Sequence, residues 1–198
     1  MIHDTTMYLP LVERIKREAT VVDGRILKID HFLNHRIEPG FMHDLGAAMA
    51  ERLRPYQADL ILTAEASGIA PALVTSLALG VPLVYAKKYP PLSVEPPALS
   101  RIVPSPTKGG DVRLAISTRY LTPDLRVAIV DDFLANGRTA LALAEMIADA
   151  GSQPVAAGFI VEKRFQHGRA PIEARGVPVV ALASIARLEG DQVVFAEE

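Results

Sequence analysis

Residues 126–145 read RVAIVDDFLANGRTALALAE, and this stretch determines the predicted fold. Four apolar residues, Val127–Val130, are followed at once by two acids, Asp131 and Asp132, and then by a short loop. From Gly137 onward the segment is rich in alanine and leucine, which favours a helix. The stretch therefore predicts a buried strand, an acidic loop and a helix that opens at Gly137.

Acids at the end of a buried strand indicate a ligand site, because open α/β sheets bind ligands outside the carboxyl ends of their strands. A helix N-terminus offers free N–H groups that attract phosphate, and Gly137 lets a ligand approach the backbone closely. Carboxylates for hydroxyl groups and a backbone cradle for phosphate together suit a ribose 5-phosphate. The residues alone leave a second interpretation open, in which Asp131 and Asp132 only close a turn.

Composition narrows the function classes. The chain has 198 residues, enough for a single domain over residues 1–198, and 49% of them are hydrophobic. A formal net charge of −2 argues against a nucleic-acid binder, which usually carries a basic excess. The absence of cysteine excludes disulfides and thiolate nucleophiles, and it fits a reducing compartment. We expect a soluble, cytoplasmic protein.

Predicted strands and helices alternate along the chain. Helices are predicted at 11–19, 39–53, 69–79 and 137–150, and strands at 25–29, 59–63, 82–86, 127–130, 155–161 and 177–183. The strands are apolar without alternation, which is typical of a parallel sheet covered on both faces. The sequence therefore predicts the α/β class, with a mostly parallel twisted sheet and helices on both faces.

One uncharged stretch, Ala66–Ala86, has about the length that spans a bilayer. Gly80 and Pro82 interrupt it, and such a step ends one element before another begins. A buried helix followed by a buried strand explains the stretch better, so we expect no membrane association.

The segment Tyr89–Asp111 differs from the rest because it holds six of the fifteen prolines. Long irregular segments inside compact domains are usually functional lids or disordered. Because Arg113–Ser117 returns as a strand, we expect a mobile, hairpin-like flap here.

The chain resembles type I phosphoribosyltransferases in four blocks: ILKIDHFLNH, LTAEASGIAPALVTSLALGVPLVYAKK, VDDFLANG and IVEKRFQHGR. VDDFLANG resembles their phosphoribosyl-diphosphate signature, and its FLANG form is similar to that of members that act on xanthine. The resemblance runs over nearly the whole chain. It implies the type I phosphoribosyltransferase fold, with a flexible flap and a small base-binding hood from the N- and C-terminal segments, and a homodimer.

The resemblance also implies roles around the acids. Asp131 and Asp132 would contact the ribose hydroxyls and stabilise positive charge at C1 as diphosphate departs. The phosphate loop, which would wrap the 5-phosphate, comprises Ala135, Asn136, Gly137, Arg138 and Thr139. The diphosphate would meet Glu65, Ala66, Ser67, Gly68, Lys87 and Lys88. Mg²⁺ is expected to arrive with the diphosphate substrate, and no dedicated metal site is expected in the protein.

Four residues are implied as contacts for the purine base. Lys163 can only donate hydrogen bonds, so contact with O6 would favour an oxo purine over adenine. Asn34 would donate to the 2-oxo group of xanthine, Leu27 would pack on the base, and Phe133 would flank it. Without the resemblance, Lys163 would be an ordinary surface lysine and Leu27 an ordinary core residue.

Two further groups of residues lie outside these contacts. Arg101 and Lys108 of the flap are expected to close over the substrate and exclude water. His31, His35 and Asp44 could suggest a metal site, but the histidines lie in a segment that reads as a loop, and we expect no zinc there.

The expected activity is transfer of the 5-phosphoribosyl group from 5-phosphoribosyl 1-diphosphate to N9 of xanthine. The products would be xanthosine 5-monophosphate and diphosphate, a reaction of purine salvage. One alternative is a phosphoribosyltransferase for guanine, hypoxanthine or adenine. Another is a non-catalytic regulator that senses 5-phosphoribosyl 1-diphosphate and binds DNA, which would need a basic surface that the composition does not favour.

Overall fold

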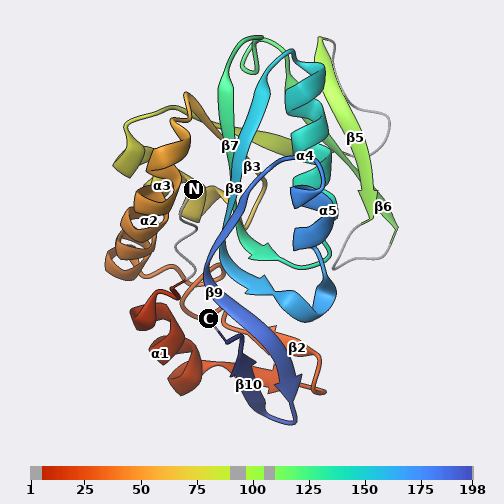
Figure 1. Ribbon diagram of the computed structural model, residues 1–198. Helices are drawn as coiled ribbons and strands as arrows, with labels where there is room; N and C mark the ends of the chain where they lie inside the picture. Colours follow the sequence, from red (N-terminus) through yellow and green to blue (C-terminus); the bar gives the residue numbers. More distant parts are fainter. Residues whose placement is uncertain (1–5, 90–96, 105–109, 198) are drawn as a thin grey trace.

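The computed structural model describes residues 6–89, 97–104 and 110–197. Its centre is an eight-stranded sheet with the order β10-β9-β8-β7-β3-β4-β6-β5 (Figure 1). The strands are β3 (Leu60–Ala64), β4 (Leu83–Tyr89), β5 (Ala98–Pro104), β6 (Asp111–Ser117), β7 (Arg126–Leu134), β8 (Gln153–Lys163), β9 (Val179–Glu189) and β10 (Gln192–Phe195). Neighbours from β9 to β4 pair in parallel, whereas β10, β6 and β5 pair antiparallel. The predicted mostly parallel sheet is confirmed.

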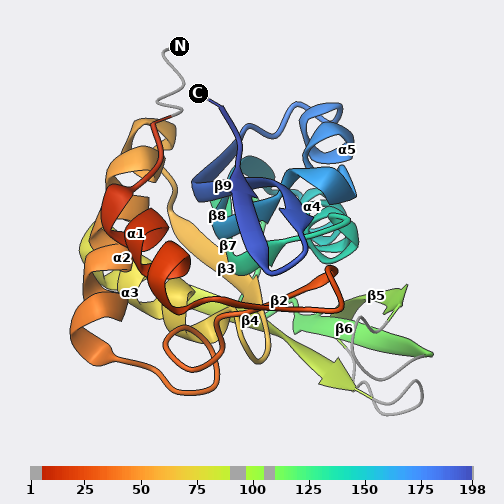
Figure 2. The ribbon, with the colours of Figure 1, turned by 90° about the horizontal axis from the view of Figure 1, so that it is seen from below.

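Helices cover both faces of this sheet, as predicted. They are α1 (Leu9–Glu18), α2 (Pro39–Leu53), α3 (Ile69–Leu79), α4 (Arg138–Asp149) and α5 (Arg169–Glu173), with 3-10 turns at Arg54–Tyr56 and Arg164–Gln166. Figures 1 and 2 show α1, α2 and α3 on one face and α4 and α5 on the other. The chain therefore has the layered α/β architecture that the sequence predicts.

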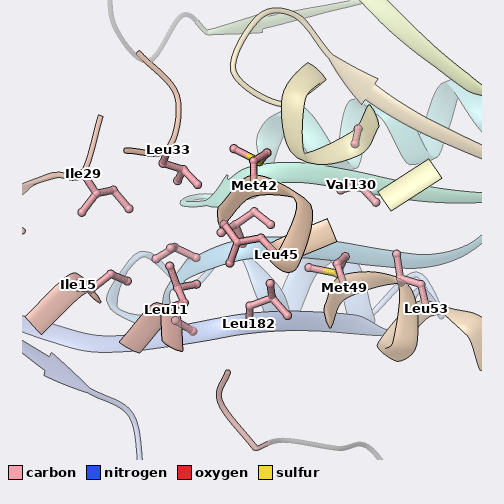
Figure 3. Close-up of a cluster of buried hydrophobic side chains, with 14 of the residues drawn as sticks. Leu11, Ile15, Ile29, Leu33, Met42, Leu45, Met49, Leu53, Val130 and Leu182 are labelled. Atoms are coloured by element: carbon pink, nitrogen blue, oxygen red, sulfur yellow. The ribbon is translucent and has the colours of Figure 1, made fainter. Parts of the chain in front are cut away.

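The central strand β7 explains why its apolar residues do not alternate with polar ones. Successive residues point to opposite faces of a strand, so Val127 and Ile129 enter the core beneath α4. Ala128 and Val130 enter the core on the other face, where Leu45 of α2 also packs (Figure 3). All four strand residues are fully buried. Both sides of the strand are thus interior.

A small two-stranded sheet lies apart from the central one. It pairs β1 (Thr20–Val22) antiparallel with β2 (Ile26–Lys28), near α1 and β10 at one end of the molecule (Figure 1). The Tyr8 amide, just before α1, donates to the Leu182 carbonyl of β9 across 2.7 Å. The N-terminal segment is therefore attached to the C-terminal strands. Neither β1 nor β10 was predicted from the sequence.

The uncharged stretch Ala66–Ala86 divides into α3 and the first part of β4, as predicted. Gly80 ends the helix in a left-handed conformation, with φ at +73°. Within the described ranges, no helix is long and apolar enough to cross a membrane.

The proline-rich segment contains an antiparallel hairpin. Its strands β5 and β6 pair from Ala98 opposite Ser117 to Pro104 opposite Asp111. Residues 90–96 and 105–109, including Lys108, lie outside the described residues. The movement expected of this flap stays a prediction.

Candidate active site

The two acids lie inside a strand rather than after it. β7 continues to Leu134, and Asp131 pairs with Phe159 of β8 while Leu134 pairs with Glu162. The predicted strand end at Val130 was wrong. Polar side chains do not interrupt the backbone hydrogen bonds that β7 makes with the long neighbouring strand β8. The phosphate loop begins only after Leu134.

The helix after the phosphate loop starts one residue later than predicted. Gly137 is the N-cap of α4, with φ at +77°, a conformation that glycine adopts without strain. Gly137 has no side chain to cap the helix, and the Arg138 amide donates to Asn136 Oδ1 at 3.2 Å, so a ligand would be bound mainly by the other amides of the first turn. An anion at this position would also be favoured by the helix dipole.

A cavity of about 850 Å³ lies at the carboxyl ends of the parallel strands β3, β4, β7 and β8. Its lining includes the acids, the whole phosphate loop, and residues from β2, the loop after β3, and β8. The lining residues are Arg25, Ile26, Asn34, Ala64, Glu65, Ser67, Lys88, Pro104, Asp131, Asp132, Phe133, Leu134, Ala135, Asn136, Gly137, Arg138, Thr139, Ala140, Phe159, Lys163 and Gln166. Most of the predicted site residues therefore meet in one cavity.

Asp132 is buried and held from several sides. Its carboxylate accepts hydrogen bonds from Asn34 Nδ2 at 2.6 Å, from Ser67 Oγ at 3.1 Å and from the Phe133 amide at 2.9 Å. Such bonds to an ionised group are among the strong ones in proteins. The carboxylate is consequently fixed in orientation.

Asp131 occupies a different electrostatic environment. Burial and the nearby Asp132 carboxylate raise the pKa of Asp131 well above its usual range, and Lys88 partly opposes this rise. Its Oδ1 accepts a hydrogen bond from the Asp132 amide at 2.9 Å. A positively charged ligand group or reaction centre near the pair would offset the repulsion between the two acids and favour the ionised form of Asp131.

The residues predicted to meet the diphosphate are only partly brought together. Glu65 and Ser67 line the cavity, but Ala66 and Gly68 do not. A Cβ on Gly68 would lie 2.4 Å from Asp131 Oδ1, so glycine allows this loop to approach the acid. The loop backbone is thus close to the acids even where its side chains are not in the lining.

The two lysines of β4 separate. Both are exposed, but Lys88 lines the cavity and its amide donates to the Glu65 carboxylate, whereas Lys87 is absent from the lining. Side chains alternate across a strand, so two adjacent lysines do not face the same side. Lys87 is therefore not among the lining residues of this cavity, and its contact with the diphosphate stays a prediction.

Lys163 is the last residue of β8, not a residue beyond it, and its half-buried side chain lines the cavity. Its Nζ lies 4.6 Å from the centre of the Phe133 ring. Burial lowers the pKa of Lys163, and the Asp132 charge opposes that shift. A partly desolvated ammonium beside an aromatic ring is a strong, directional hydrogen-bond donor.

Leu27 is a core residue rather than part of the cavity lining. It is 6% exposed and packs in the core on the α1–α2 side, while its neighbours Arg25 and Ile26 line the cavity. Because side chains alternate across a strand, either Ile26 or Leu27 had to face the site. The block ILKIDHFLNH does not indicate which of the two it is. Gln166, at the 3-10 turn after β8, was also missed.

Arg101 does not point into the cavity. Its guanidinium pairs with Glu145 of α4, with 3.0 Å between Nε and Oε2, and it also contacts Asp149. Two acids on α4 hold Arg101 away from the cavity in this arrangement, and its closure over the substrate stays a prediction. Pro104 at the end of β5 lines the cavity instead.

Within the described part of the chain, no group of three or more His, Asp or Glu side chains gathers as a metal cage. His31 Nε2 lies 3.7 Å from Glu18 Oε2, and the His31 ring packs edge-on against Phe32. Asp131 and Asp132 offer oxygen ligands at the cavity, which are the type Mg²⁺ prefers.

Solved structures with the same fold define the class of the protein. The chain matches adenine phosphoribosyltransferase from Thermoanaerobacter pseudethanolicus with a TM-score of 0.72, at 25% identity and over 87% of this chain and 99% of that one. The enzyme from Saccharomyces cerevisiae, solved with adenine and an imino-altritol bisphosphate, gives a TM-score of 0.72 at 24% identity over 88% and 99%. The fold is that of a type I phosphoribosyltransferase.

Sequence relatives narrow this class. A xanthine phosphoribosyltransferase of Chloroflexus aurantiacus is 57% identical over 94% of this chain and 88% of its own length. Those of Deinococcus deserti and Oenococcus oeni are 45% and 44% identical, over 90% and 95% of this chain and 93% and 91% of their own lengths. No protein-family model matches the chain. The chain belongs to the xanthine phosphoribosyltransferase family.

Proposed function

We propose that the protein transfers the 5-phosphoribosyl group from 5-phosphoribosyl 1-diphosphate to N9 of xanthine. The products are xanthosine 5-monophosphate and diphosphate, and the reaction serves purine salvage. The observation that carries the proposal is the meeting of Asp131, Asp132 and the phosphate loop in one cavity. Relatives named for this activity support the choice of base.

In the proposed reaction the N9–C1 bond forms while the bond from C1 to the diphosphate oxygen breaks. The electron pair of the broken bond leaves with diphosphate, and the proton that N9 gives up passes to solvent. Positive charge develops at C1, and the carboxylates of Asp131 and Asp132 stabilise it electrostatically while contacting the ribose hydroxyls. The amides at the start of α4 hold the 5-phosphate.

Mg²⁺ is proposed to enter as a complex with the diphosphate substrate. Asp131 and Asp132 can contact the ion, because Mg²⁺ in nucleotide sites usually takes one or two carboxylates and keeps several waters. When bound, it neutralises charge on the leaving diphosphate. Lys88 and the backbone of the Glu65–Gly68 loop complete the diphosphate side.

Base choice is proposed to rest on two donors. Lys163 donates to O6 of an oxo purine, whereas the 6-amino group of adenine offers it no acceptor at that position. Asn34 donates to the 2-oxo group of xanthine. Phe133 flanks the base, and Ile26 takes the apolar role that the sequence assigned to Leu27.

The protein is proposed to act as a homodimer in the cytoplasm. Support comes from α3, an uncharged helix that leaves Leu73 and Leu77 on one face with 55% and 73% of their surface exposed. Tyr85 on the adjacent β4 is 41% exposed. Large exposed apolar side chains that share one helix face are typical of an interface between subunits.

Steady-state kinetics with xanthine, guanine, hypoxanthine and adenine tests the proposal. We expect kcat/KM for xanthine to exceed that for each other base by at least about tenfold, which corresponds to about 1.4 kcal/mol. A larger value for another base would replace the substrate. Absence of turnover together with salt-sensitive, sequence-selective DNA binding would favour a regulator.

A further inference from the structure

Gly168, outside the phosphate loop, lies directly against the backbone of that loop. A Cβ built on Gly168 would lie 2.3 Å from the Ala135 carbonyl oxygen and 2.6 Å from the Gly137 amide nitrogen. In the other direction, a Cβ on Gly137 would lie 2.6 Å from the Gly168 carbonyl oxygen. Two glycines thus face each other at a backbone-to-backbone contact that has no room for a side chain.

The next residue, Arg169, is held by a buried acid. Its Nε and Nη2 donate to Glu162 Oε1 and Oε2 at 2.8 and 2.6 Å, a bidentate pair in which Glu162 is 1% exposed. Nη1 of Arg169 also donates to the Val179 carbonyl at 2.7 Å, and Ser184 Oγ donates to Glu162 at 3.0 Å. Gly168 is therefore adjacent to a residue fixed to two strands.

Glu162 also connects to the other end of the phosphate loop. In the β7–β8 ladder it pairs with Leu134, the residue that immediately precedes Ala135. Glu162 thus adjoins the strand that enters the loop through its backbone, and its carboxylate holds the segment that supports the loop from outside. A buried ion pair is weak evidence for stability by itself, because desolvation offsets much of its attraction.

We propose that Gly168 and the Glu162–Arg169 pair are positioning residues for the phosphate loop. They fix the loop backbone so that its amides converge on the 5-phosphate of the substrate, and they do not contact the purine. This inference rests on the proposed function of the loop and extends it to residues outside the cavity lining. A side chain at position 168 displaces the Ala135 carbonyl and the Gly137 amide together.

The first test is Gly168→Ala. Gly168 has φ at −70°, which alanine adopts readily, so the substitution changes the contact and not the backbone preference. Gly40→Ala is the matched control, because a Cβ on Gly40 meets nothing within 4 Å. Calorimetry measures the Kd of ribose 5-phosphate and, separately, that of xanthine in the presence of diphosphate, alongside circular dichroism.

We expect Gly168→Ala to weaken ribose 5-phosphate binding about tenfold or more and to leave xanthine binding within about twofold, whereas Gly40→Ala changes neither. Equal weakening of both ligands, or unchanged sugar phosphate binding in a folded variant, would overturn the inference.

Arg169→Lys provides a second test if Gly168→Ala does not fold. Lysine keeps the positive charge but cannot reproduce the bidentate fork. We expect a selective rise in the Kd of ribose 5-phosphate, about threefold to tenfold; wild-type values for both ligands would contradict the positioning role. Failure of the wild-type protein to bind ribose 5-phosphate would instead overturn the proposed function itself, so the two failures are distinguishable.

Discussion

The side-chain amide of Asn34 donates to the carboxylate of Asp132 across 2.6 Å, although 98 residues separate them in the sequence. The family resemblance implied contact with the base for Asn34 and contact with the ribose for Asp132. An asparagine amide has two N–H donors, so one can hold the acid while the other reaches the purine. The hydrogen bond therefore couples the position of a proposed base-binding residue to that of a proposed ribose-binding residue.

This contact predicts different results for two alanine variants. Asn34→Ala and Ser67→Ala each remove one hydrogen bond to Asp132, worth about 1.5–3 kcal/mol for a charged acceptor, so both should lower kcat/KM. Only Asn34→Ala should also reduce the preference for xanthine over hypoxanthine, because only Asn34 is proposed to reach the 2-oxo group. Steady-state kinetics with both bases tests this. An unchanged preference in Asn34→Ala would show that Asn34 holds Asp132 but does not contact the 2-oxo group of xanthine.

Lys163 predicts a pH dependence. Burial lowers its pKa, so it loses its proton, and the charged donor is lost, at a lower pH than for an ordinary lysine. The activity of wild type with xanthine should therefore fall on the alkaline side before that of Lys163→Arg, whose guanidinium stays charged. Ionisation of xanthine is common to both enzymes, so the difference isolates residue 163. Coincident alkaline limbs would contradict this role.

Asp131 should contribute to activity at the expense of stability. Its pKa is raised in the folded protein, so folded chains bind more protons than unfolded ones, and stability falls as pH rises from the unfolded pKa towards the folded one. Asp131→Asn removes this loss and can keep the hydrogen bond from the Asp132 amide. We expect Tm at neutral pH to rise by about 2 °C or more, and kcat to fall about 100-fold.

Measurement near pH 3 provides the control for that variant. There the wild-type acid is protonated in both states, and the two Tm values should converge. A lower Tm for Asp131→Asn at neutral pH would show that the ionised acid is stabilising, contrary to the environment described.

The exposed face of α3 predicts the assembly. A Leu73→Glu, Leu77→Glu double variant should be monomeric in light scattering while the wild type is dimeric, because buried unpaired carboxylates destabilise an interface. Ile102→Glu is the control, since Ile102 is 57% exposed on β5, away from α3. A double variant that remains dimeric would place the interface elsewhere.

Much of the fold could be predicted because its signals are local. The boundaries of α2 and α3 match the sequence prediction, since Pro39 opens one helix and Gly80 ends the other. The parallel sheet could also be predicted from a local signal, namely short runs of apolar residues without polar alternation. β1 and β10 were missed because short edge strands depend on a pairing partner more than on their own residues.

The site was less predictable because it depends on which way side chains point. Adjacent residues in the sequence blocks, such as Lys87 and Lys88, separate onto opposite sides of a strand. Arg101 turns to acids on α4 that no local pattern associates with it. The support of the phosphate loop by Gly168 appears only when distant backbones are placed together.

The central claim is that Asp131, Asp132 and the phosphate loop hold one sugar phosphate. A crystal structure of the protein with ribose 5-phosphate tests it most directly. The account predicts the phosphate at the amides of residues 137–139, with the ribose hydroxyls against the two carboxylates. A sugar phosphate bound well away from these acids and this loop would contradict it.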